Sequence, residues 1–99
     1  ILGFKINMIA ELKDKLLNLS DNISLSISEC LSLNSLDYIR VNALGKKGSI
    51  TTYLKDLRDY DDVSKREIGS LVNEIKNKIN QEIKMRQVIL SRLLFLLYL

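Results

Sequence analysis

The chain of 99 residues contains no proline, no tryptophan and no histidine, and it has only four glycines and one cysteine. Because proline is the residue that most sharply ends a helix, its absence favours long uninterrupted helices. The absence of histidine removes the commonest general base and the commonest zinc ligand. Cys30 cannot form an internal disulfide, which favours a reducing compartment, and it follows Ile23 and Ile27 in an apolar stretch. We therefore predict that Cys30 packs in a core rather than acting as a nucleophile.

The composition is that of a folded protein with a mildly basic surface. Hydrophobic residues make up 46% of the chain and charged residues 27%, which is too apolar for disorder. Fifteen basic and twelve acidic residues give a formal net charge of +3. This charge permits a nucleic-acid partner, but by itself it fits the plainer interpretation of a solvated helix surface.

Two long stretches carry apolar residues at helical spacing. Steps of three and four residues of this kind form the seam of a helix that packs against another helix. No segment alternates with a period of two over a useful length, so strands are not expected. The first stripe comprises Ile9, Leu12, Leu16, Leu19 and Ile23, and the second comprises Ile68, Leu71, Val72, Ile75, Ile79 and Ile83.

Two shorter helices are predicted between these long ones. Asn34 or Ser35 can cap the first, which is expected to end at Gly45 in the left-handed conformation common at helix C-termini. Ser49 can cap the second.

The last helix is predicted to begin at a capping box formed by Ser64 and Glu67. With two long amphipathic helices and two short ones, the predicted fold class is all-α. The predicted architecture is an antiparallel two-helix coiled-coil hairpin with the short helices at its turn.

The two ends of the chain differ from the helical arm predicted for residues 8–87. Residues 1–7 precede the first methionine, Met8, and are interpreted as upstream or disordered residues. Residues 88–99 are apolar on every helical face, but they are too few to span a membrane and Arg92 interrupts them. We interpret them as the product of a truncated or frameshifted gene, or as an apolar cap buried against the helices or another chain.

The most informative segment runs from Arg40 to Thr51, where two glycines bracket Lys46 and Lys47. A tight turn here would direct both ammonium groups outward, clear of the hairpin, as suits a phosphate backbone. The spacing is not that of a phosphate-binding P-loop, and no buried strand precedes it. On these residues alone, an ordinary turn kept soluble by lysines is slightly favoured over a phosphate-binding one.

The pattern Arg40-Val-x-x-Leu-Gly-Lys-Lys-Gly-x-Ile-Thr51 resembles a motif in the N-terminal region of bacterial phenylalanine–tRNA ligase alpha subunits. Lys55 and Arg58 fall in the helix that follows, and residues 69–76 are similar to that family's next helix. The resemblance covers the chain from about Met8 to about Arg86.

The resemblance implies a coiled-coil arm that contacts tRNA(Phe) in a cytoplasmic heterotetramer with a beta subunit and a second alpha subunit. ATP, magnesium and phenylalanine bind to a downstream class II catalytic domain in that family. None of its motifs is present here, so we predict no catalytic, cofactor-binding or metal-binding residue in this chain. The residues that the resemblance assigns to nucleic-acid binding are Arg40, Lys46, Lys47, Lys55 and Arg58.

Two departures from the family accompany this resemblance. Asp61 and Asp62 stand where prolines are common, so we expect a looser start to the last helix. After Arg86 the chain becomes predominantly apolar instead of staying polar. Two alternative functions follow: a helical hairpin that pairs through its apolar seam and tail without catalysis, or a membrane-associated peptide that uses residues 88–99.

Overall fold

The computed structural model describes the backbone of residues 2–55, 57 and 60–98, and the side chains from residue 9 onward within these ranges. Its four helices are α1 (Leu2–Glu29), α2 (Leu33–Leu44), α3 (Ser49–Lys55) and α4 (Asp62–Tyr98). No strand occurs in these ranges, so the predicted all-α class is confirmed. The bundle is elongated, with extents of 64 × 20 × 15 Å.

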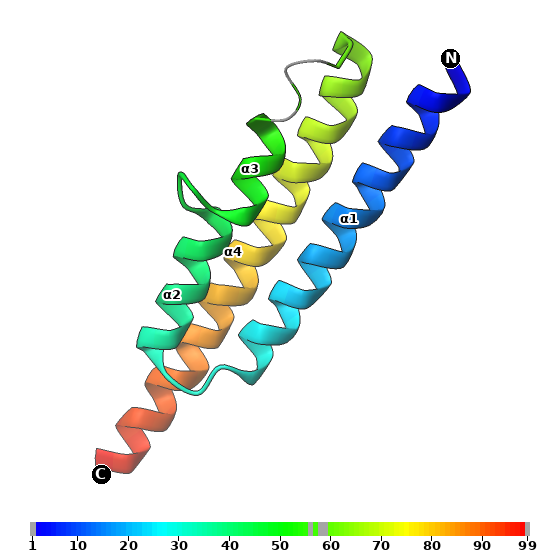
Figure 1. The fold of residues 1–99 in the computed structure, drawn as a ribbon. Coiled ribbons are helices and arrows are strands. Elements are labelled where there is room, and N and C mark those ends of the chain that lie inside the picture. Colours follow the sequence, from blue (N-terminus) through cyan, green and yellow to red (C-terminus); the bar gives the residue numbers. More distant parts are fainter. Residues whose placement is uncertain (1, 56, 58–59, 99) are drawn as a thin grey trace.

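The two long helices run in the same direction (Figure 1). The chain reverses after α1, returns through α2 and α3, and reverses again before α4. Two contacts at different heights support this arrangement. Lys13 Nζ lies 3.1 Å from Glu67 Oε2, and Arg86 Nη2 lies 2.6 Å from the Cys30 carbonyl oxygen. The paired residues are separated by 54 and 56 positions, and a nearly constant separation is the mark of parallel helices.

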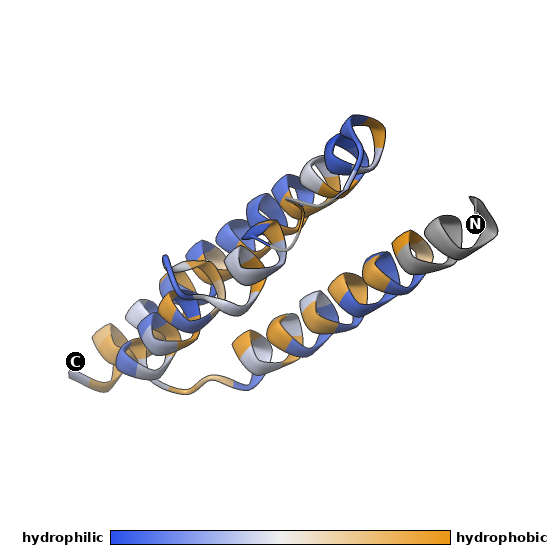
Figure 2. Ribbon diagram, turned by 45° about the horizontal axis from the view of Figure 1, so that its top comes forward, coloured by the Kyte–Doolittle hydropathy of each residue, from blue (hydrophilic) through white to orange (hydrophobic). Residues whose placement is uncertain are grey.

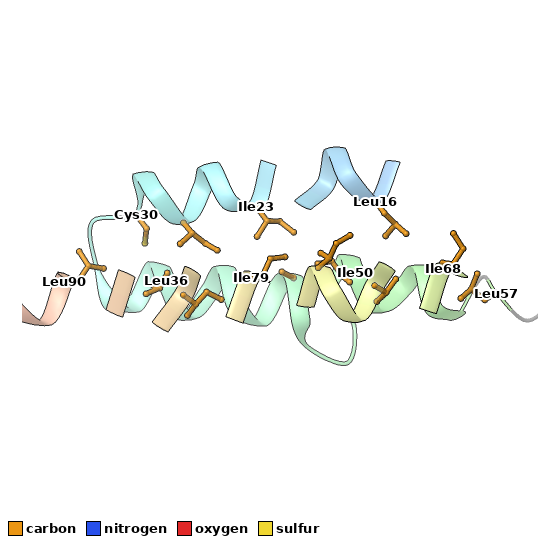
Figure 3. Packing of buried hydrophobic residues seen from close by; sticks show 14 residues of the cluster. Leu16, Ile23, Cys30, Leu36, Ile50, Leu57, Ile68, Ile79 and Leu90 are labelled. Carbon is orange, nitrogen blue, oxygen red and sulfur yellow. The ribbon is translucent and has the colours of Figure 1, made fainter. Parts of the chain in front are cut away.

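The predicted antiparallel hairpin of the two long helices is therefore wrong, as is the position of the short helices at its turn. The reason lies in the apolar residues of the returning segment, since Leu36 and Ile50 are completely buried and Ala43 and Leu57 nearly so. Burying a leucine or isoleucine contributes about 1.5–3 kcal/mol, which is forfeited if these helices stand free at a turn. They pack along α4 instead and form the third side of the bundle (Figure 3).

The core draws on all four helices, as Figure 3 shows. Both predicted stripes face it, so the predicted seams are confirmed, with Ile9, Leu12, Leu19 and Leu71 only partly buried. Cys30 is also buried, and its thiol donates to the Ser32 carbonyl at 3.2 Å, which confirms its predicted packing role. The buried apolar residues are Leu16, Ile23, Ile27, Cys30, Leu36, Ala43, Ile50, Leu57, Ile68, Val72, Ile75, Ile79, Ile83 and Leu90.

The start of α2 lies slightly earlier than predicted. Ser32 is its N-cap, with extended backbone angles, and its hydroxyl accepts the backbone N–H of Ser35 at 3.1 Å. The predicted caps, Asn34 and Ser35, lie within the first helical turn instead.

The start of α4 also differs from the prediction. Asp61 precedes the helix, its carbonyl accepts the N–H of Lys65 at 2.9 Å, and its carboxylate accepts the N–H of Ser64 at 3.3 Å. Asp61 therefore takes the N-cap position, and an acidic residue is favourable there because it also faces the positive end of the helix dipole. Glu67 pairs with Lys13 instead of closing a capping box with Ser64. The aspartate thus caps the helix start where a looser one was expected.

Neither of the predicted domain boundaries coincides with a break in a helix. The backbone of residues 2–7 belongs to α1, and residues 88–98 continue α4 without interruption. Along α1 and α4, polar and apolar residues alternate in the manner of amphipathic helices (Figure 2). We call residues 88–98 the α4 tail.

Candidate nucleic-acid interface

The four residues from Gly45 to Gly48 join α2 to α3, and we call this segment the basic turn. The N–H of Gly45 donates to the Val41 carbonyl at 2.9 Å, and the N–H of Gly48 donates to the Gly45 carbonyl at 2.8 Å. Lys46 and Lys47 lie between these two bonds, and both side chains are exposed. The turn protrudes partway along the bundle, on the side away from α1 (Figures 1 and 3). It is a lateral projection and not the tip of a hairpin, where it was expected.

Both glycines of the basic turn are required by close backbone approach. A Cβ atom at Gly45 would lie 2.5 Å from the Val41 carbonyl oxygen, and one at Gly48 would lie 2.6 Å from the Ala43 carbonyl oxygen. Gly45 has φ −67° and ψ 173°, which is extended backbone, so the predicted left-handed conformation is wrong. The glycines are needed here because a side chain would collide with the last turn of α2.

The basic turn is anchored on both sides by buried residues. Ala43 precedes it with 2% of its surface exposed, and Ile50 follows it fully buried. At the start of α3, the backbone N–H and the hydroxyl of Thr52 both donate to the Gly48 carbonyl, at 3.0 and 2.9 Å. The two lysines therefore extend from a backbone that is held in place at both ends.

Arg40 is engaged within its own helix. Its Nε and Nη2 atoms donate to Oδ1 of Asp37 at 3.0 and 2.8 Å, and both side chains are about half exposed. The spacing of three residues on one helix could have predicted this pair from the sequence. Because exposed ion pairs contribute little, a phosphate can replace Asp37 as the partner of Arg40 at small cost.

The remaining predicted binding residues belong to the segment after the basic turn. Lys55 is the last residue of α3 and is exposed, and six helical steps of 1.5 Å separate it from Ser49 by about 9 Å along the axis. Arg58 lies outside the described residues. The structure thus brings Lys46 and Lys47 together and places Lys55 at the far end of α3. Such spaced cations suit a run of phosphates better than a single anion.

Charge is unevenly shared between the two sides of the bundle. The sequence of α1 carries four carboxylates and three lysines, whereas residues 33–55 carry four cationic side chains and one carboxylate. In α4, seven cationic residues exceed four acidic ones. The side formed by α2, α3 and the basic turn is therefore the more attractive one for a polyanion.

Other kinds of site find no support in the parts of the chain that the structure describes. Residues 9–55, 57 and 60–98 contain no group of three acidic, cysteine or histidine side chains that could hold a metal ion. Among the described helices, none combines the length and the apolar character that crossing a bilayer requires.

Comparison with known families identifies the part of the chain that carries the basic turn. Residues 31–93 match the family described as "Aminoacyl tRNA synthetase class II, N-terminal domain". No solved structure gives a significant match. The matched region includes α2, the basic turn, α3 and most of α4.

Individual relatives give the same result. The phenylalanine–tRNA ligase alpha subunit of Wolbachia pipientis wMel is 37% identical over 82 residues, which cover 82% of this chain and 24% of that protein. The alpha subunit of Fusobacterium nucleatum is 38% identical over 69 residues, covering 70% of this chain and 20% of that protein. The alpha subunit of Oenococcus oeni is 34% identical over 81 residues, which cover 82% of this chain and 23% of that protein. The chain spans about a quarter of the length of these relatives. It belongs to the family of N-terminal domains of class II aminoacyl-tRNA synthetases, in the form found in phenylalanine–tRNA ligase alpha subunits.

Proposed function

We propose that this chain acts as the tRNA-binding arm of a phenylalanine–tRNA ligase alpha subunit, with Lys46 and Lys47 contacting phosphates of tRNA(Phe). The observation that carries the proposal is the basic turn, which presents two adjacent exposed lysines on a backbone fixed by Gly45 and Gly48. The turn lies within the region that matches the synthetase family.

The arrangement suits positioning of a tRNA rather than recognition of its sequence. Lysine contacts to phosphate oxygens set the orientation of a nucleic acid without reading its bases. A packed helical body 64 Å long can hold such contacts at a distance from a catalytic centre. Lys55 extends the cationic row along α3, and Arg40 joins it by exchanging Asp37 for a phosphate. Arg58 remains part of the proposed contact on the resemblance alone.

In this proposal the arm supports aminoacylation and performs no chemistry of its own. The partners are tRNA(Phe), a beta subunit and a second alpha subunit, together in a cytoplasmic heterotetramer. ATP, magnesium and phenylalanine belong to the catalytic domain of the parent enzyme. The arm contributes binding energy that brings the acceptor end of the tRNA to that domain.

Salt-dependent binding of a tRNA(Phe) transcript tests the proposal. Replacing both Lys46 and Lys47 by alanine should weaken binding and reduce the slope of log affinity against log salt by about two, since each phosphate that a lysine neutralises adds nearly one to that slope. Fluorescence anisotropy titrations at several salt concentrations measure both quantities.

A matched pair of single variants separates a specific contact from a general decrease in positive charge. Lys47→Ala and Lys15→Ala each remove one exposed cation, but Lys15 lies on α1 and not at the basic turn. We expect the slope to fall for Lys47→Ala and to stay the same for Lys15→Ala. Equal effects of the two variants, or an unchanged slope in the double variant, would rule out the basic turn as the contact.

A further inference from the structure

The side of α4 that packs on α1 continues beyond the end of α1. Arg86 lies level with Cys30, one residue after the end of α1 at Glu29. Met85, Ile89, Leu93 and Leu96 follow one another in steps of three and four residues, and between 46% and 68% of each remains exposed. This spacing is the pattern of a helix-packing seam. No described helix covers it beyond Arg86.

A groove between α1 and α4 leads into this seam. It has a volume of 330 Å³ and is lined by Ser24, Ile27, Ser28, Glu82, Met85, Arg86 and Ile89. Oε2 of Glu82 is buried and has no hydrogen-bond partner among the described residues. Arg86 lies one turn along the helix, but its guanidinium donates to the Cys30 carbonyl. A buried carboxylate oxygen without a donor is costly, and because Glu82 as a whole is only partly buried, its carboxylate can turn toward a cationic or donor group in the groove.

We propose that two copies of this chain pair antiparallel through Met85 and Ile89 of the seam, so that Arg92 of each copy enters the other's groove and binds Glu82. One register brings Met85 and Ile89 together with the two charged residues. Met85 then lies opposite Ile89 of the partner. In an antiparallel pair, the residue three positions before Met85 faces the residue three positions after Ile89. Glu82 then lies opposite Arg92, and twofold symmetry forms each contact twice.

A second copy fits this surface better than a lipid bilayer does. A phosphatidylcholine bilayer covers the apolar residues, but its choline cation has no N–H to donate to Glu82, and burying Arg92 with them in the hydrocarbon is costly. A second copy supplies a cation for Glu82, an anion for Arg92 and apolar partners for Met85 and Ile89. The pairing surface lies along α1 and α4, whereas the basic turn protrudes on the side away from α1. The inference therefore does not depend on tRNA binding.

Sedimentation of the whole chain over a range of concentrations tests the pairing. Arg92→Glu and Glu82→Arg should each raise the dimer dissociation constant at least about tenfold, because like charges then meet across the interface. Lys84→Glu makes the same charge change as Arg92→Glu, at an exposed position outside the seam, and should leave the dimer nearly unchanged. Circular dichroism verifies that the variants keep their helical content.

Mixing the two weakened variants gives the most specific result. A chain with arginine at both positions and a chain with glutamate at both positions match each other across the proposed register. The mixture should form heterodimers with a dissociation constant within about threefold of the unaltered homodimer. A monomeric chain at all concentrations, or two variants that fail to complement each other, would overturn the pairing. So would flotation of the unaltered chain with phosphatidylcholine vesicles in place of dimer formation.

Discussion

The basic turn and the α4 tail both project from the packed bundle, but the side chains that they expose have opposite character. The basic turn exposes lysines, and buried residues on either side hold its backbone. The α4 tail exposes leucine and aromatic side chains, with Leu97 and Tyr98 more than four-fifths exposed. A solvated charge is already favourable in water, whereas covering an exposed apolar face lowers the free energy. The comparison separates a surface suited to a polyanion from one suited to an apolar partner.

The largest expected difference is between two alanine substitutions and their effects on the free energy of unfolding. One replaces Ile50, next to the basic turn, and the other replaces Leu96 in the α4 tail. Ile50→Ala empties a fully buried site and should cost about 2–5 kcal/mol. Leu96 is 65% exposed, so Leu96→Ala should cost less than about 0.5 kcal/mol in the monomer. Urea unfolding at concentrations below dimer formation measures both. A comparable destabilisation of the two variants would show that the tail belongs to the core of the monomer.

The second difference compares two glycines. Gly48→Ala places a Cβ 2.6 Å from the Ala43 carbonyl oxygen and should lower the free energy of unfolding by about 1–3 kcal/mol. Gly69 lies inside α4 with nothing within 4 Å of an added Cβ. Gly69→Ala should therefore raise stability by about 0.5–1 kcal/mol, because alanine favours helix more than glycine does. Thermal unfolding followed by circular dichroism distinguishes the two, and stabilisation by both substitutions would contradict the proposed backbone contact.

The smallest expected effect concerns Asp37 and Arg40. Asp37→Asn removes an exposed ion pair, so the free energy of unfolding should change by no more than about 0.5 kcal/mol. The same change frees Arg40 and removes a negative charge from the basic side of the bundle. The affinity for a tRNA(Phe) transcript at low salt should rise severalfold, as measured by anisotropy. Unchanged affinity would exclude Arg40 from the contact.

Local features of this protein could be predicted from residue spacing. The stripes of α1 and α4, the burial of Cys30, the break between Gly45 and Gly48 and the exposure of its two lysines all follow from short-range patterns. Two helix starts were misplaced because several serine and aspartate residues near each start can act as caps. The Arg40–Asp37 pair follows a spacing of three residues and could have been recognised in the same way.

The sequence by itself determined that the chain is helical, which faces of its helices are apolar, and that two lysines are held between glycines. Only the tertiary structure decided that α1 and α4 run parallel and that the short helices lie along them. Helical periodicity defines a buried face but contains no information about the direction of the helix that covers it. The direction follows from the returning segment, which lies against α4 and buries Leu36 and Ile50 there. The same packing brought the end of α1 level with Arg86 and left Oε2 of Glu82 without a hydrogen-bond partner among the described residues, beside an open seam.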